Sequence, residues 1–157
     1  ITKLNNKAHF FPVHVLLYTL PGKPSIYYGS EFAIEGEKKP YADDILRPEL
    51  NFEDYNTSLE SNENTKLIAA LGNMRNSNPW VGEAGYRELL LTNRQYAFLR
   101  EYGDKRLVAI VNNDDNNADV HLNISGEFTE IFSGEKRNFD GNMHVNIPGN
   151  SGQVWIG

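Results

Sequence analysis

Apolar residues near the start of the chain recur at intervals of three or four positions, as on one face of an α-helix. These positions are Leu4, Ala8, Phe11, Val15 and Tyr18. Asn5 or Asn6 is the expected N-cap, and Pro12 either kinks the helix or marks its first turn. The helix is predicted to end at residues 21–24, because two prolines and a glycine cannot continue it.

A short aromatic strand is predicted at Ser25–Tyr28, closed by Gly29. Residues 30–62 follow as a polar, acidic stretch without a clear period, and compact domains rarely carry so long a loop without a function for it. A second helix is expected to begin between Ser61 and Asn64 and to end at Asn78-Pro79. Its inward-facing residues are Leu67, Ile68, Leu71 and Met74, and Arg75 lies in its last turn, where a cation is favoured.

From about residue 86 the pattern changes to short alternating segments separated by Gly, Asn and Asp. Hairpin turns are expected at Asn93-Arg94 and at Gly103-Asp104. About seven short strands at this spacing indicate an antiparallel β-sandwich, and the change of period is a candidate domain boundary. The predicted strands span residues 87–92, 96–102, 106–112, 118–124, 128–132, 143–147 and 153–156.

Composition narrows the class of protein. The 157 residues carry a formal net charge of -6, are 39% hydrophobic and include no cysteine. The hydrophobic fraction is too high for a disordered chain, and the acidic balance argues against binding nucleic acid by phosphate neutralisation. Disulfides and thiolate sites are excluded. The longest apolar run, residues 15–20, is far shorter than the roughly 20 residues of a membrane helix. No secretion signal is visible, and a cytoplasmic location is favoured.

One segment carries a specific resemblance. Residues 20–31 read Leu-Pro-Gly-Lys-Pro-Ser-Ile-Tyr-Tyr-Gly-Ser-Glu, and an Arg-Pro step at Arg47-Pro48 and a Met-Arg phrase before Pro79 follow in order. This series resembles the segment around the eighth barrel strand of the α-amylase family of glycoside hydrolases. Within that family it resembles the neopullulanase, maltogenic amylase and α-glucosidase types.

The resemblance implies an α/β plus all-β fold. Residues 1–82 would be the last α-β-α portion of a TIM (β/α)8 barrel: seventh helix, eighth strand, long loop and eighth helix. Residues 83–157 would be an antiparallel β-sandwich C-terminal domain. The full-length enzyme would hydrolyse α-glucosidic bonds in starch-like oligosaccharides by retaining double displacement. Its carboxylates, including that of an Asn-His-Asp motif, are expected upstream of Ile1.

No catalytic residue, cofactor or metal is therefore expected in this chain, and the chain alone should be inactive. The implied partner is an α-glucan oligosaccharide, with no nucleic acid and no membrane. Open strand edges and uncovered apolar helix faces would also favour self-association of the fragment. The sandwich has its own core, so it is expected to fold alone and to behave better without the first 80 residues.

Three residues are candidates for substrate binding, each with a structural alternative. Tyr28 stacks on a sugar or packs in the core. Glu31, just beyond the predicted strand, lines the active-site wall or bonds local backbone. Arg47 binds carboxylates or sugar hydroxyls, or it fixes its loop through an acidic neighbour, for which Asp43, Asp44 and Glu49 are available.

Other readings of the chain stay open. The acidic loop is interpreted as a solvated surface rather than a calcium site, since no glycine-centred spacing supports one. His121 and His144 fall in the predicted sandwich without identifiable partners. The sandwich could instead be a carbohydrate-binding or structural module, although most of its aromatic residues sit at positions that suit a core. Within the family, a transglycosylase or isomerase fits as well as a hydrolase.

Overall fold

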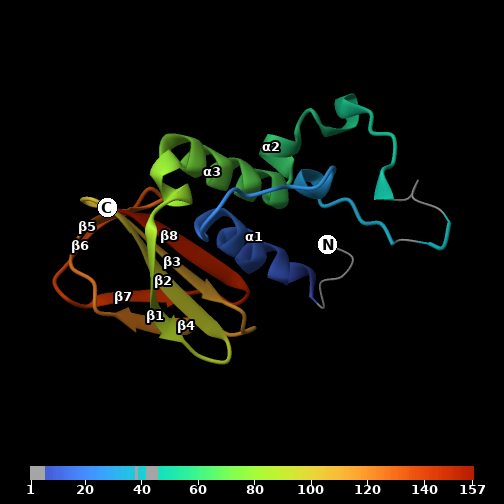
Figure 1. The fold of residues 1–157 in the computed structure, drawn as a ribbon. Helices are drawn as coiled ribbons and strands as arrows, with labels where there is room; N and C mark the ends of the chain where they lie inside the picture. The colour runs from blue at the N-terminus through green and yellow to red at the C-terminus, as the bar shows by residue number, and fades with distance from the viewer. Residues whose placement is uncertain (1–5, 38, 42–45) are drawn as a thin grey trace.

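The computed structural model describes residues 6–37, 39–41 and 46–157. Its first half contains helices joined by long segments without helix or strand (Figure 1). Asp43 and Asp44 of the acidic loop lie outside the described residues. The helices are η1 (Lys7–His9), α1 (Phe10–Thr19), η2 (Ser30–Phe32), η4 (Phe52–Tyr55), α2 (Ser58–Ser61), α3 (Glu63–Ser77) and η5 (Pro79–Gly82).

Both long helices begin near the expected caps. The Asn6 side chain accepts a hydrogen bond from the Ala8 backbone N–H at 2.9 Å and so caps η1, which leads directly into α1. Asn62 caps α3 by accepting from two backbone N–H groups. Pro12 is the third residue of α1, where the backbone donor that it lacks would have no partner within the helix.

The second half forms eight strands in two antiparallel sheets, which confirms the predicted antiparallel architecture. The larger sheet has the order β1-β2-β3-β8-β5-β6, and β4 pairs with β7 in a second sheet. The strands are β1 (Gly85–Leu91), β2 (Gln95–Tyr102), β3 (Lys105–Asn112), β4 (Ala118–Leu122), β5 (Gly126–Glu130), β6 (Lys136–Phe139), β7 (Met143–Ile147) and β8 (Ser151–Ile156).

Both predicted hairpins are confirmed. Leu91 pairs with Tyr96 and Tyr102 pairs with Lys105 across the two turns. The strand that the sequence did not predict is β6, whose four residues bury only Phe139. The other three residues of β6, Lys136, Arg137 and Asn138, are polar and leave no apolar alternation to detect.

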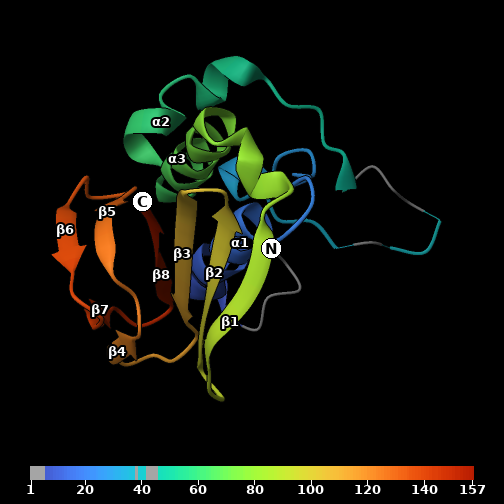
Figure 2. The ribbon, with the colours of Figure 1, turned by 60° about the vertical axis from the view of Figure 1, so that its left-hand side comes forward.

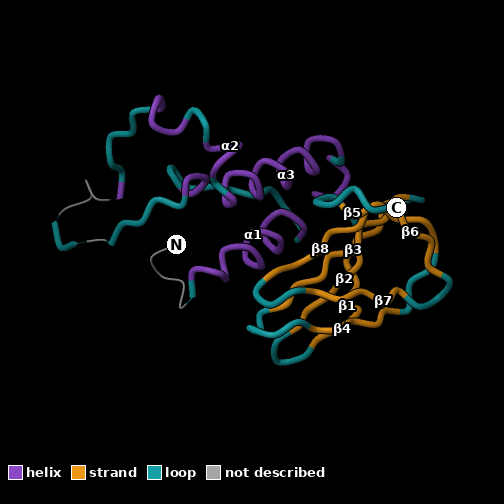
Figure 3. The backbone as a smooth tube through the Cα atoms, turned by 180° about the vertical axis from the view of Figure 1, so that it is seen from behind, coloured by secondary structure: helices purple, strands orange, loops and turns teal. Residues whose placement is uncertain are grey.

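The larger sheet is buried on both faces (Figure 2). On one face it packs against the β4–β7 pair through residues that include Leu99, Ile110 and Trp155. On the other face, residues that include Phe98 and Val154 share a second apolar cluster with α1 and α3. The backbone view from behind shows the helices and strands as adjoining layers (Figure 3). The helices therefore complete the core of the strand-rich half.

A glycine permits the close approach of α1 to the sheet. A Cβ atom at Gly152 on β8 would lie 2.6 Å from the carbonyl oxygen of Ile110 and 3.4 Å from Cγ2 of Val15 on α1. Real Cβ atoms almost never come within 3.0 Å of such an oxygen. Any side chain at position 152 would therefore push the helix or the neighbouring strand away.

The predicted strand at Ser25–Tyr28 is wrong for this chain. Residues 23–27 carry no secondary structure, and Tyr28 and Gly29 lie in a turn. An isolated extended segment is not stable as a strand, because its backbone N–H and C=O groups need a neighbouring ladder. The described residues show antiparallel sheets and no barrel. None of the described helices is long and apolar enough to cross a membrane.

Candidate functional site

An open pocket of about 450 Å³ lies where the Tyr-Tyr segment meets the Arg-Pro step. It brings together two of the three predicted site residues, Tyr28 and Arg47. Tyr27 and Tyr28 have exposed fractions of 54% and 46%, so their rings are available to a ligand rather than packed in a core. The described lining residues are Tyr27, Tyr28, Arg47, Pro48 and Glu49.

Two hydrogen bonds join the two sides of this pocket. Arg47 Nε donates to the Tyr27 hydroxyl oxygen at 3.1 Å. The Tyr28 hydroxyl donates to the Pro48 carbonyl oxygen at 3.1 Å. The two phenols thus hold the Arg-Pro step in place, and the tyrosine pair and the arginine form one unit although they lie far apart in sequence.

Gly29 allows the chain to turn directly after the tyrosine pair. It has a φ of 79°, in the left-handed region, and a Cβ there would lie 3.0 Å from Cδ1 of Ile34. Its carbonyl oxygen accepts from the backbone N–H groups of Phe32 and Ile34. A residue with a side chain would be both strained and crowded here, so the glycine fixes where the tyrosines point.

Glu31, the third predicted residue, is placed elsewhere. It lies in η2, and its backbone carbonyl accepts a hydrogen bond from the Thr65 hydroxyl at 2.7 Å, which docks η2 on the start of α3. Burial raises the pKa of Tyr18 on α1, and the negative charge of Glu31 raises it further. Glu31 is not among the described residues that line the pocket.

The described lining of this pocket carries groups that can bind a polar ligand. It offers two phenol rings, a guanidinium and one carboxylate, that of Glu49, among its described lining residues. Retaining glycosidases need two carboxyl groups roughly 5 Å apart. Rings and a planar donor group are the usual means of holding a sugar or another polar, partly apolar ligand. The described residues also include no group of three or more potential metal ligands placed to hold an ion.

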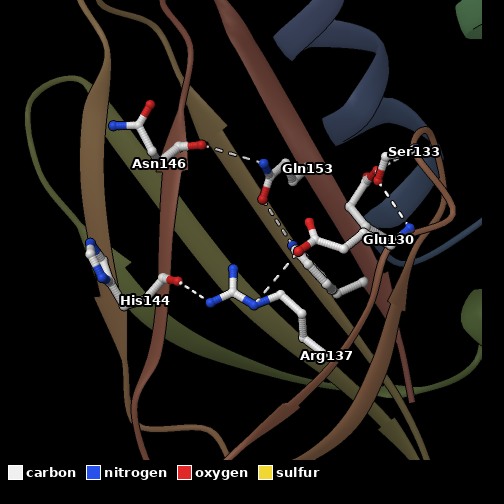
Figure 4. A network of polar contacts seen from close by, with 8 residues as sticks. Glu130, Ser133, Arg137, His144, Asn146 and Gln153 are labelled. Atoms are coloured by element: carbon white, nitrogen blue, oxygen red, sulfur yellow. Dashed lines mark hydrogen bonds and ion pairs between the residues drawn. The ribbon is translucent and has the colours of Figure 1, made fainter.

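A second polar network lies within the strands, and its function is structural (Figure 4). Glu130 at the end of β5 is only 3% exposed. Its Oε2 accepts from the backbone N–H groups of Phe132 and Ser133 and from the Ser133 hydroxyl, and its Oε1 accepts from the Val154 N–H. This carboxylate organises the turn after β5, and nothing in the sequence pattern singled it out.

The same view shows how β7 is tied to the larger sheet (Figure 4). Gln153 Nε2 donates to the Asn146 carbonyl oxygen at 3.4 Å, and Arg137 Nη2 donates to the His144 carbonyl oxygen at 3.1 Å. The Arg137 guanidinium also lies 4.9 Å from the centre of the Phe139 ring. These bonds connect β6 and β8 of the larger sheet to β7 of the smaller one.

His121 and His144 have partners that the sequence did not reveal. They lie directly opposite each other on β4 and β7. Their rings stack with centroids 4.1 Å apart and planes 5° from parallel. Such a pairing depends on strand register, which no local spacing encodes.

The chain is similar to known proteins in both sequence and fold. Residues 91–156 match the family described as Alpha amylase, C-terminal all-beta domain. That range runs from the last residue of β1 to the last residue of β8. A cyclomaltodextrin glucanotransferase from Thermoanaerobacterium thermosulfurigenes is 28% identical over 121 residues, which are 76% of this chain and 15% of that protein.

Two crystal structures show the same fold over nearly the whole chain. An α-amylase from Anoxybacillus superposes with a TM-score of 0.77 at 22% identity, covering 95% of this chain and 31% of that one. An α-amylase from Geobacillus thermoleovorans, complexed with acarbose, superposes with a TM-score of 0.75 at 19% identity, covering 97% and 34%. The chain thus spans about a third of each structure and a smaller share of the glucanotransferase.

These comparisons confirm the resemblance that residues 20–31, Arg47-Pro48 and the Met-Arg phrase carry in the sequence. The strand-rich part of the chain, residues 91–156, is thus similar to the C-terminal all-beta domain of the α-amylases.

Proposed function

We propose that this chain is the C-terminal part of an enzyme that acts on α-glucans. In that enzyme residues 1–82 form the last helix, strand and helix of a TIM barrel, and residues 83–157 form the β-sandwich domain that follows. The order of α1, the Tyr-Tyr segment, a long loop and α3 supports this division. Ser25–Tyr28 becomes a strand only when neighbouring barrel strands pair with it.

The pocket formed by the tyrosine pair and Arg47 carries the proposal. Active sites of such barrels lie at the C-terminal ends of the strands, and Tyr28 and Gly29 stand at that end of the proposed eighth strand. The bonds from Arg47 to Tyr27 and from Tyr28 to Pro48 hold the two phenol rings and the guanidinium together on one side of the pocket. In the whole enzyme this side of the pocket holds part of an oligosaccharide, while Glu31 docks η2 on α3 through its backbone carbonyl.

The chemistry of the whole enzyme comes from carboxylates outside this chain, by retaining double displacement. The purified 157-residue chain should therefore show no turnover of maltodextrin, pullulan or cyclodextrin. Turnover that is lost on substitution of any one of its own carboxylates would contradict the proposal. Hydrolysis and transfer both fit, because the known relatives include α-amylases and a glucanotransferase.

An NMR titration of the full chain with maltotriose or acarbose tests the binding part of the proposal. We expect millimolar binding, with shifts confined to Tyr27, Tyr28 and the segment around Arg47, and a loss of those shifts in Tyr28→Ala. Tyr102→Ala is the matched control, since Tyr102 is 52% exposed at the end of β2. Shifts confined to the strands would contradict the proposal and favour a carbohydrate-binding module.

A further inference from the structure

Two chain segments form the tyrosine pocket, and each leads into a short helix. The described lining residues are Tyr27, Tyr28, Arg47, Pro48 and Glu49. The tyrosine pair comes before η2, and the Arg-Pro step comes before η4. The two hydrogen bonds across the pocket lie at the surface, where water competes for the same groups and each bond contributes little. The arrangement of the pocket therefore depends on where η2 and η4 are attached.

The start of α3 holds η2 through two side chains. The Thr65 hydroxyl donates to the Glu31 carbonyl oxygen at 2.7 Å. Asn62 Nδ2 donates to the Phe32 carbonyl oxygen at 3.3 Å. Asn62 is also the N-cap of α3, because its Oδ1 accepts from the backbone N–H groups of Asn64 and Thr65. Two neighbouring carbonyls of η2 are thus bonded to one fixed turn of helix.

Thr65 makes the stronger of these two attachments. Its bond is the shorter one, and Thr65 is only 9% exposed, whereas Asn62 is half-buried. A hydroxyl that water cannot reach finds no replacement for a lost acceptor, so breaking this bond costs more than breaking an exposed one. Thr65 is not among the described residues that line the pocket, so it acts on the pocket only through η2.

The position of η2 determines both sides of the pocket. The backbone N–H of Ser30, the first residue of η2, donates to the Tyr27 carbonyl oxygen at 2.9 Å, and the Tyr27 hydroxyl accepts from Arg47 Nε. The last residue of η2, Phe32, stacks on Tyr55 of η4, with ring centroids 4.2 Å apart and planes 24° from parallel. A displacement of η2 would therefore move the tyrosine pair relative to the Arg-Pro step.

We propose that Thr65 is a positioning residue for the tyrosine pocket. Through the Glu31 carbonyl it holds η2, and with η2 the phenols of Tyr27 and Tyr28, in the arrangement that binds a ligand. That this ligand is an α-glucan oligosaccharide rests on the proposed function, whereas the effect of Thr65 on the two phenols does not. Serine would serve at this position, since it also donates from a hydroxyl, and valine would not.

Three variants of the full chain test the proposal by NMR, first without ligand and then with maltotriose. In Thr65→Val we expect the ring signals of Tyr27 and Tyr28 to shift and the affinity for maltotriose to fall about three- to tenfold. Thr65→Ser keeps the donor and should restore both readouts. Thr19→Val is the matched control and should leave both readouts unchanged, since the buried Thr19 hydroxyl donates to a carbonyl oxygen of α1, that of Val15.

Two results would overturn the proposal: tyrosine signals in Thr65→Val that match the wild type, or a serine variant that behaves like the valine variant. If the tyrosine signals shift in Thr65→Val but the wild type does not bind maltotriose, Thr65 positions the phenols and the proposed sugar binding is the part that fails. Circular dichroism establishes that the valine variant is folded. If it is not, Thr65→Ala removes the same hydroxyl with a residue that favours helix, and the same two readouts decide.

Discussion

The guanidinium of Arg100 on β2 donates from Nη1 to the carbonyl oxygen of Thr19, the last residue of α1, at 2.7 Å. The same side chain donates to the carbonyls of Gly85 and Ala84 at 3.0 and 2.6 Å, and it is fully buried. Burial lowers the pKa of Arg100, and the charge of Arg75 lowers it further. One cation thus connects the end of a helix, the start of the sheet and its second strand.

Replacing Arg100 with methionine should destabilise the chain strongly. The methionine fills similar space but leaves the three carbonyls without their donor, and each lost bond to a charged group costs about 1.5–3 kcal/mol. Because the three hydrogen bonds come from one side chain, their costs do not simply add. We expect the free energy of unfolding to fall by about 3–5 kcal/mol in total. Urea denaturation measures it. Arg87→Met on exposed β1 is the control and should change stability by less than about 0.5 kcal/mol. An unchanged midpoint in Arg100→Met would show that the bonds contribute nothing.

Glu130→Gln tests the buried carboxylate at the end of β5. The charged oxygen accepts from Ser133 N–H at 2.7 Å and from the Ser133 hydroxyl at 2.8 Å. The amide in its place weakens these bonds and adds a donor that finds no acceptor there, for a loss of about 1–3 kcal/mol. Thermal unfolding at pH 7 checks it, with Glu127→Gln on the exposed side of the same strand as control. Equal effects of the two substitutions would contradict a special role of Glu130.

His14 should make folding stability depend on pH. Burial lowers its pKa below the ordinary 6.5, against a smaller opposite effect of its bond to the Phe10 carbonyl. The unfolded chain therefore takes up a proton at His14 more readily, and stability falls as the pH drops below about 6.5. In His14→Phe, the free energy of unfolding should fall less between pH 7 and 5 than in the wild type. His9→Asn is the control, and identical pH slopes in the wild type and His14→Phe would rule out the effect.

The sequence predicted the elements whose signals are local. Helical spacing placed α1, Asn62 caps α3 where a helix start was expected, and strand alternation with short turns gave the two hairpins. Tyr28 and Arg47 were chosen separately as candidates, and they share one pocket. That they share it could not be derived, because the sequence between them has no clear hydrophobic period.

The features that could not be predicted from the sequence depend on contacts between residues far apart in the chain. Ser25–Tyr28 has strand composition but no neighbouring strand to pair with, and β6 has a neighbour but no apolar pattern. The His121–His144 pair follows from the register of β4 and β7. The buried position of Arg100 follows from the packing of α1 on the sheet, since a charged residue in a strand normally indicates a solvent-facing position.

The strand-rich half was expected from the sequence to fold alone and to behave better without the first 80 residues. The structure leads to the opposite expectation. Removing residues 1–81 would uncover the apolar face of the larger sheet, including Phe98, Leu107 and Val154, all of which are fully buried in the chain. It would also take away the Thr19 acceptor of the Arg100 guanidinium. A contiguous apolar patch of this kind promotes association.

A chain trimmed to residues 82–157 should therefore associate more, and unfold more readily, than the whole chain. Light scattering over a range of concentrations and thermal unfolding of both chains measure this. A second trimmed chain, with Leu107→Thr and Val154→Thr on the uncovered face, is the control: polar side chains there should reduce the association. If the trimmed chain is monomeric at high concentration and as stable as the whole chain, α1 and α3 are dispensable for the core of the sandwich, and the domain boundary near residue 82 is also a boundary of folding.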